Sequence, residues 1–273
     1  MIEIISSEQN SRVKLLRKLY NKKKRRQKGK FVLEGYRITD EALNAEADFD
    51  YLFMSPDFYR SEEGQNLEKD FLKSNNKNDL VIVEEKLLSS IADTESPQGV
   101  IAVVNEPEFE MKDIFLEGKE MNSLLLLDRI QDPGNMGTII RTAVAAGIDG
   151  IIILKGSVDI YNLKVLRATM GAIFSIPVIK DVELDELFES INSSRKDYRI
   201  VSADLSGDLY YHQLAYDYPF IIAIGNEANG LQDQIIENSD YLIKIPILGG
   251  IDSLNAAIAT GIIVYKAVEK NWE

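Results

Sequence analysis

Three short segments of the chain place glycines beside polar side chains, a combination that suits ligand binding. The first is DPGNMGTIIR, residues 132–141, in which Asn135 and Arg141 stand six residues apart. Its Asp-Pro-Gly turn signal predicts the start of a helix, with Asn135 at the loop and Arg141 nearly two turns further on. A guanidinium at that place either binds a phosphate or forms a surface ion pair.

The second segment is GNEANGLQ, residues 225–232. Its glycines have the spacing of a phosphate-binding P-loop, but Leu231 and Gln232 stand where that loop needs Lys and Ser or Thr. The sequence therefore excludes cleavage of a nucleoside triphosphate by a P-loop. Glu227 follows a predicted buried strand and is placed either to meet a ligand or to lie in a solvent-exposed turn.

The third segment is IPILGGIDSLN, residues 245–255, whose paired glycines let the backbone approach a ligand closely. Ser253 is the predicted N-cap of a helix that starts at Leu254, with Asn255 in its first turn. Ser253 lacks the G-x-S-x-G elbow, and the single histidine, His212, lies in a polar, tyrosine-rich connection. The segment therefore does not favour a serine hydrolase.

Composition and charge narrow the chemistry further. The chain has no cysteine and one histidine, which excludes thiol nucleophiles and polyhistidine or cysteine metal sites, so we expect no metal. The net charge is −13, yet residues 1–30 hold eleven Lys or Arg against two Glu. This stretch is either a polyanion-binding arm on an acidic body or a solvated helix face. The candidate binding residues are Lys22, Lys23, Lys24, Arg25 and Arg26.

The elements that must position the three segments begin at residue 123, where apolar runs alternate with helical segments. This alternation predicts an α/β fold with a parallel sheet covered by helices on both faces. Ligands of such sheets bind outside the carboxyl ends of the strands, where all three segments lie. We expect strands at 124–127, 151–154, 176–179, 198–202, 220–224 and 241–245, and helices near 135–146, 162–170, 184–194, 231–238 and 254–269.

The chain before residue 123 has a different organisation. We expect a small α/β domain over residues 1–104, an acidic linker over 105–122, and the parallel-sheet domain over 123–273. The first domain is predicted to hold helices at 8–27 and 36–43 and strands at 51–54, 80–83 and 100–104. No apolar run is long enough to span a membrane, and no signal peptide is present, so we expect a cytoplasmic protein.

Taken together, the motifs resemble those of the SpoU/TrmH family of RNA 2′-O-ribose methyltransferases. The matching patterns are DPGN-x-G-x-x-x-R-x-A at 132–143, GNE-x-x-G-[LM] at 225–231 and IP-x-x-G-G-x-x-SLN at 245–255. The segment ATMGAIFSIPV at 168–178 also matches, so the resemblance covers residues 123–270. The basic stretch followed by FVLEG is similar to the substrate-binding domain that precedes the catalytic domain in ribosomal RNA members.

The resemblance implies a deep trefoil knot that binds S-adenosylmethionine, a homodimer, and RNA as the partner of the basic arm. The implied cofactor contacts are Gly225, Asn226, Ile245, Leu248 and Leu254. The implied catalytic set is Asn135, Arg141, Glu227, Ser253 and Asn255. Within it we favour Arg141 as a phosphate clamp, because a guanidinium is not readily deprotonated. The chain departs from many members at Asp252 and at Ala256-Ala257, beside the SLN motif.

The function expected from these features is methylation of a ribose 2′-hydroxyl in 23S ribosomal RNA with S-adenosylmethionine. Two alternatives stay open: the same reaction on transfer RNA, and a non-catalytic RNA-binding protein that retains the fold. Titration with S-adenosylmethionine separates the enzyme from the binding protein.

Overall fold

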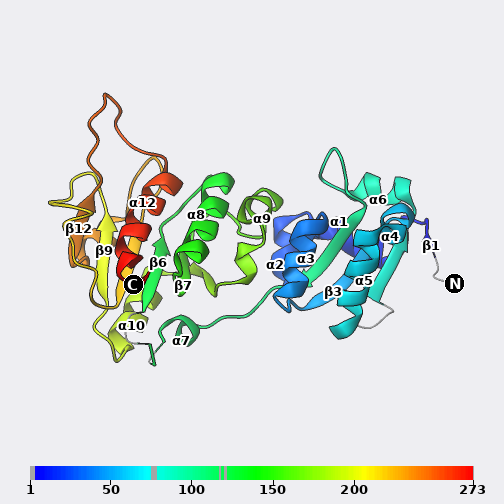
Figure 1. Cartoon of the computed structure of the whole chain (residues 1–273), viewed down its shortest axis with the longest axis horizontal. Helices are drawn as coiled ribbons and strands as arrows, with labels where there is room; N and C mark the ends of the chain where they lie inside the picture. Colours follow the sequence, from blue (N-terminus) through cyan, green and yellow to red (C-terminus); the bar gives the residue numbers. More distant parts are fainter. Residues whose placement is uncertain (1–3, 75–78, 117, 120–121, 273) are drawn as a thin grey trace. The chain divides into compact units, whose positions relative to one another are not determined.

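The computed structural model describes residues 4–74, 79–116, 118–119 and 122–272 (Figure 1). It divides into two compact units. The first comprises Met1–Glu108 together with Tyr161–Phe174, and the second comprises Phe109–Ile160 together with Ser175–Glu273. Among the described residues, no helix combines the length and apolar character that crossing a membrane requires.

The first unit is built on a mixed sheet with the strand order β1-β4-β3-β5-β2. Strand β5 pairs antiparallel with both β2 and β3, whereas β4 pairs parallel with β1 and β3. The strands are β1 (Ile4–Ile5), β2 (Lys30–Glu34), β3 (Phe49–Met54), β4 (Leu80–Val83) and β5 (Val100–Asn105). The helices are α1 (Ser11–Leu19), α2 (Lys22–Lys28), α3 (Tyr36–Asn44), α4 (Pro56–Arg60), α5 (Glu62–Ser74) and α6 (Glu85–Ile91).

The helix expected over residues 8–27 is in fact two helices, α1 and α2, and the prediction of one helix was wrong. Asn21 adopts an extended conformation, and its side chain accepts a hydrogen bond from the backbone N–H of Lys24. It thereby caps α2 and breaks the helical path. The Arg25 guanidinium donates to the carbonyls of Leu19 and Tyr20, at 3.0 and 2.9 Å, and so closes the end of α1.

A helix from the second half of the sequence, α9 (Leu163–Thr169), belongs to the first unit. The ring of Tyr161 stacks on Phe31 of β2 with centroids 4.2 Å apart, and both rings are buried. The expected boundaries counted this stretch with the parallel-sheet domain. The expected linker also holds structure, because α7 (Met111–Ile114) buries Ile114 completely in the core of the second unit.

The second unit contains the predicted parallel sheet, with the strand order β10-β12-β9-β11-β6-β7-β8. Its strands are β6 (Ser123–Leu127), β7 (Gly150–Leu154), β8 (Val178–Val182), β9 (Arg199–Ala203), β10 (Leu209–Tyr210), β11 (Phe220–Ile224) and β12 (Tyr241–Lys244). Its helices are α8 (Pro133–Ala146), α10 (Leu184–Ser193), α11 (Asp233–Glu237) and α12 (Ala256–Val268). The short strand β10 was not predicted from the sequence.

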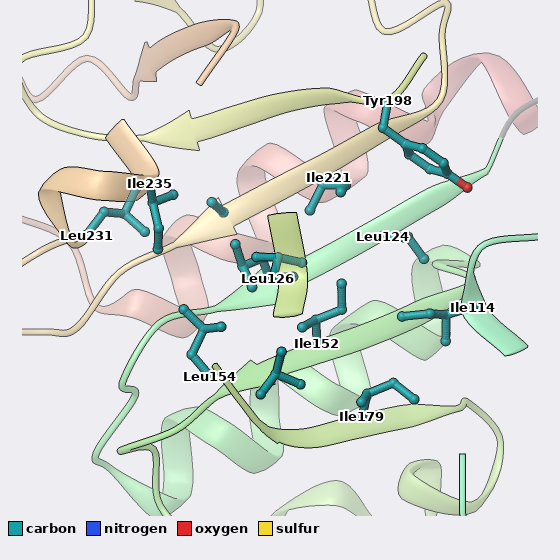
Figure 2. Close-up of a cluster of buried hydrophobic side chains, with 13 residues drawn as sticks. Ile114, Leu124, Leu126, Ile152, Leu154, Ile179, Tyr198, Ile221, Leu231 and Ile235 are labelled. Atoms are coloured by element: carbon teal, nitrogen blue, oxygen red, sulfur yellow. The ribbon is translucent and has the colours of Figure 1, made fainter. Parts of the chain in front are cut away.

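Alternate residues of the central strands form one hydrophobic core (Figure 2). Leu124 and Leu126 of β6, Ile152 of β7 and Ile221 of β11 are fully buried there, and Ile235 of α11 covers them. Full burial of each such side chain stabilises the fold by about 1.5–3 kcal/mol. Helix α12 packs against α8 and β11. This packing holds the loops that follow β6, β11 and β12 in defined positions.

Candidate functional site

A chain of hydrogen bonds joins the three motif segments in the second unit. Asn135, at the start of α8, donates from Nδ2 to Oε1 of Glu227 at 3.0 Å. Its Oδ1 accepts from Nδ2 of Asn255 at 2.8 Å. One residue of each predicted segment is thus in direct contact with another, as the sheet topology requires. Asn135 is held from both sides, so neither end of its amide is free to rotate.

Asn255 is also the N-cap of α12. Its Oδ1 accepts from the backbone N–H groups of Ala257 at 2.9 Å and Ile258 at 3.2 Å. The prediction that Ser253 caps a helix starting at Leu254 was therefore wrong, because the helix begins two residues later. An asparagine amide carries both an acceptor and a donor, so Asn255 caps α12 and binds Asn135 at once. Ser253 is left exposed.

Glu227 holds the loop that leads into α8. Its carboxylate accepts from the backbone N–H groups of Gln131 at 3.2 Å and Asp132 at 3.3 Å, in addition to Asn135. Partial burial raises the pKa of Glu227, but these hydrogen bonds outweigh burial, and the net pKa lies below its usual value. The side chain is therefore ionised at neutral pH and serves as an acceptor that organises the loop.

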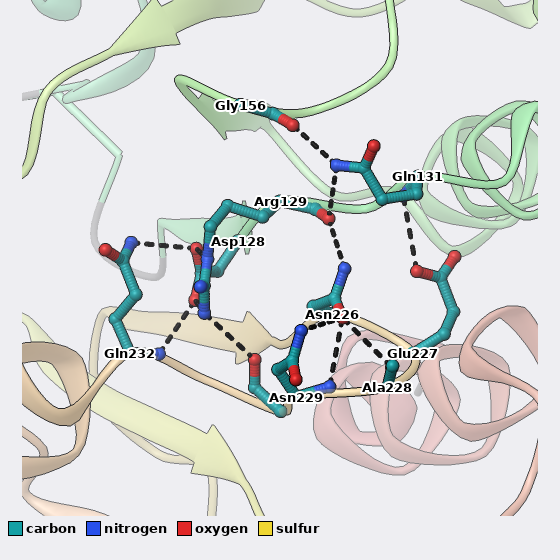
Figure 3. A network of polar contacts seen from close by, with 10 residues as sticks. Asp128, Arg129, Gln131, Gly156, Asn226, Glu227, Ala228, Asn229 and Gln232 are labelled. Carbon is teal, nitrogen blue, oxygen red and sulfur yellow. Dashed lines mark hydrogen bonds and ion pairs between the residues drawn. The ribbon is translucent and has the colours of Figure 1, made fainter.

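A second network, missed by the sequence analysis, lies at the carboxyl end of β6 (Figure 3). The Asp128 carboxylate is completely buried and accepts from Nε and Nη2 of Arg129 at 2.8 and 3.0 Å. It also accepts from the backbone N and the Nε2 of Gln232, at 2.8 and 2.9 Å. Arg129 reaches the Gly230 carbonyl at 3.3 Å. An acidic residue directly after the first buried strand was the signal that could have found it.

The glycine segment between these residues is a tight loop. Asn226 and Gly230 exchange two backbone hydrogen bonds, and Gly230 has a φ of +66°. A Cβ on Gly225 would lie 2.3 Å from the carbonyl carbon of Gly230, so only glycine fits there. The Asn226 side chain donates to the Arg129 carbonyl at 2.8 Å and accepts from the backbone of Ala228. It thereby holds the loop in shape.

These loops enclose a pocket of about 580 Å³. Four of the expected cofactor contacts, Gly225, Asn226, Ile245 and Leu254, line it, and so do Glu227 and Ser253. The fifth, Leu248, does not line the pocket, and its side chain is 98% exposed. The structure thus brings together the residues expected from two of the motifs and leaves Leu248 outside.

The pocket residues fit S-adenosylmethionine. Ile224, Ile243 and Ile263 offer apolar surface to an adenine ring, and the glycine loop lets backbone groups approach a ligand. Asp204 and Asp252 place carboxylates in the lining, which suits a ligand that carries a positive sulfonium. We expect the glycine loop and the residues around Leu254 to hold the cofactor.

Arg141 lies on α8 with an exposed side chain. Within the part of the chain that the structure describes, it makes no hydrogen bond or ion pair. The surface ion pair that the sequence left open is therefore not formed with any described residue, and the guanidinium is available to an external anion. The structure shows no contact between Arg141 and Asn135.

The candidate RNA-binding residues lie on α2 and divide into two kinds. Lys22, Lys23, Lys24 and Arg26 are exposed. Arg25 is only 6% exposed and is engaged with the end of α1, so its assignment to RNA binding is corrected to a structural role. His212 is exposed, and its ring stacks on Tyr210 with centroids 5.8 Å apart.

Comparisons with known proteins agree with this geometry. Residues 122–265 match the SpoU rRNA Methylase family, and residues 10–102 match the MRM3-like substrate binding domain. The 23S rRNA (guanosine(2553)-2'-O)-methyltransferase RlmP of Bacillus subtilis is 30% identical over 96% of this chain and 97% of its own length.

Solved structures agree as well. An AdoMet-bound rRNA methyltransferase from Sinorhizobium meliloti has a TM-score of 0.87 at 30% identity and covers 98% of both chains. The SpoU methyltransferase AviRb from Streptomyces viridochromogenes, in complex with AdoMet, has a TM-score of 0.85 at 28% identity, over 97% of this chain and 99% of that one. The chain therefore belongs to the SpoU rRNA methylase family of S-adenosylmethionine-dependent RNA methyltransferases.

Proposed function

We propose that this chain methylates a ribose 2′-hydroxyl of 23S ribosomal RNA, with the first unit binding RNA and the second catalysing the transfer. The observation that carries the proposal is the Glu227–Asn135–Asn255 chain of hydrogen bonds beside the pocket. It joins the three family motifs at the place where a methyl donor and a ribose must meet. The similarity to a 23S rRNA 2'-O-methyltransferase over nearly the whole chain supports this RNA as the substrate.

The residues have distinct roles in this mechanism. S-adenosylmethionine supplies a methyl group on a positively charged sulfur when bound in the pocket. Asn135, fixed by Glu227 and Asn255, orients the ribose at the rim, and Ser253 offers a hydroxyl beside the 2′-oxygen. Arg141 binds a backbone phosphate and stabilises the negative charge that develops on that oxygen. We assign no base role to Arg141, because guanidinium groups stay protonated in proteins.

We further propose that the catalytic unit carries the trefoil knot of its family and acts as a cytoplasmic homodimer. The loops 225–230 and 245–255 both line one pocket, which a knotted path of the chain would explain. The helix that follows, α12, exposes Ile258 and Tyr265, and the preceding loop exposes Leu248 and Ile251. Such apolar surface is typical of a protein–protein interface.

The experiment that tests the proposal is methyl transfer from radiolabelled S-adenosylmethionine to transcripts of 23S rRNA and of transfer RNA. Modification of one 23S ribose, lost in a deletion strain and restored by the gene, is the expected result. Transfer RNA as the better substrate would overturn the assignment of the RNA. Binding of RNA without binding of S-adenosylmethionine would overturn the assignment of the activity.

A further inference from the structure

The first unit contains a second pocket, of about 560 Å³, away from the methyl-transfer site. The end of β2, the start of α3, the loop before β5 and the helix α9 form its walls. Its apolar lining includes Ile38, Ala92, Pro97, Leu166 and Met170. The Met170 side chain is 51% exposed, which is unusual for so apolar a group and leaves its thioether open to a ligand.

The walls of this pocket are held in place before any ligand binds. The Glu34 carboxylate accepts from the backbone of Asp93 at 2.7 Å and of Thr94 at 3.2 Å, and from the hydroxyl of Tyr20. Oε1 of Gln98 accepts from the backbone N–H of Tyr36 at 2.8 Å. These contacts tie the loop to β2 and α3. The Glu34 charge is thereby engaged and is not offered to a ligand.

Two charged groups in the lining are not engaged. Arg37 is exposed, and neither it nor Glu41 has a hydrogen bond or ion pair with any described residue. Asp40 accepts one long hydrogen bond, from Asn44 at 3.5 Å. Arg167 is paired with Asp93 at 3.7 Å. The pocket therefore combines an apolar surface, one open guanidinium and carboxylate acceptors.

This combination matches one unstacked nucleotide. A base buries its faces against apolar side chains, its N–H groups donate to carboxylates, and its phosphate binds arginine. Uracil fits less well, because its two carbonyl oxygens would face the carboxylates, whereas guanine, adenine and cytosine each present an amino group. We infer that this pocket binds an unpaired, amino-bearing nucleotide of the substrate RNA, with the base beside Asp40 and Glu41 and the phosphate at Arg37. The inference rests on the proposed function, since it assigns the ligand to the same RNA.

The test measures binding of the full chain to fluorescein-labelled RNA decamers by anisotropy. One decamer is all uridine, and the other has a single central guanosine. We expect the guanosine decamer to bind at least about fivefold more tightly. Glu41→Gln should remove most of that preference, with Glu62→Gln, an exposed glutamate of α5, as its matched control. Arg37→Gln should weaken both decamers and reduce the salt slope of log K by about 0.7. Arg60→Gln, exposed in the same unit, is the control for Arg37.

Equal binding of the two decamers by the parent chain would overturn the inference, as would a preference unchanged in Glu41→Gln and binding unchanged in Arg37→Gln. The failure of the proposed function gives a different pattern. A chain that methylates 23S rRNA without base preference lacks only this pocket's role, whereas base preference without methyl transfer to any RNA rejects the enzyme and keeps the pocket.

Discussion

The buried carboxylate of Asp128 offers the sharpest test of how the glycine loop is held. Asp128→Asn keeps the shape of the side chain but removes its charge and one of its acceptor oxygens. In the parent chain the two oxygens accept four hydrogen bonds, from Arg129 and Gln232. The amide nitrogen of the variant must face at least one of these donors, so a buried donor loses its partner.

The size of the effect follows from this geometry. Removal of one partner from a buried ion pair costs about 3–5 kcal/mol, and hydrogen bonds to charged groups contribute about 1.5–3 kcal/mol each. The Arg129 side chain is 32% exposed, so water replaces part of what it loses. We therefore expect the free energy of unfolding of the second unit to fall by about 2–3 kcal/mol. For a domain of this size, that lowers the melting temperature by about 5–10 °C.

Calorimetry measures both consequences of Asp128→Asn. The scan reports stability, and titration with S-adenosylmethionine reports whether the loosened Gly230 and Gln232 weaken the cofactor pocket, roughly tenfold for 1.4 kcal/mol. Asp197→Asn is the matched control, because Asp197 is 78% exposed and pairs with Arg199 at 2.5 Å. It should cost less than about 1 kcal/mol. An Asp128→Asn variant as stable as this control, with unchanged cofactor affinity, would refute the reasoning.

Three further predictions concern the catalytic and RNA-binding residues. Arg141→Ala should abolish methyl transfer without changing calorimetric S-adenosylmethionine affinity, and Arg141→Lys should also be poor, since a point charge does not replace a planar fork; loss of cofactor binding would contradict this role. Because the pKa of Glu227 is lowered on folding, its contribution to stability is present above its unfolded pKa and is lost as the pH falls through the folded pKa. Denaturant titrations across acidic pH should show that loss in the parent and not in Glu227→Gln. Neutralising Lys22 and Lys23 should flatten the salt dependence of RNA binding by roughly 0.7–0.9 per phosphate contact, whereas Arg25→Gln should lower the melting temperature; an unchanged slope in the first variant would show that α2 does not grip RNA.

The sequence predicted the centre of the catalytic unit well for a physical reason. Strands β6 and β11 are buried on both faces, so each is a continuous apolar run whose limits are visible in the sequence. The three loops were found because polar residues at the ends of such strands have few structural uses. The position of Asn135 between Glu227 and Asn255 then follows from the topology, although the hydrogen bonds themselves required the structure.

The errors have physical reasons too. The break between α1 and α2 depends on Asn21, whose capping signal was hidden in a run of basic residues that suit a continuous helix. Arg25 has the same side chain as its neighbour Arg26, and only the fold decides which of them turns inward. The placement of α9 in the first unit depends on contacts such as Tyr161 with Phe31, which are far apart in the sequence. Local patterns do not carry such information.

The assignment of residues 161–174 to the first unit has a consequence for synthesis of the protein. The chain leaves the first unit after residue 108, returns at 161 and leaves again after 174. During translation, Phe31 must therefore wait for Tyr161, and the unit gains its last helix only when roughly 65 more residues have been made. At about 5–20 residues per second, that interval lasts about 3–13 seconds. Throughout it, the nascent first unit exposes the apolar surface that α9 later covers, and by then most of β6, α8 and β7 has already emerged.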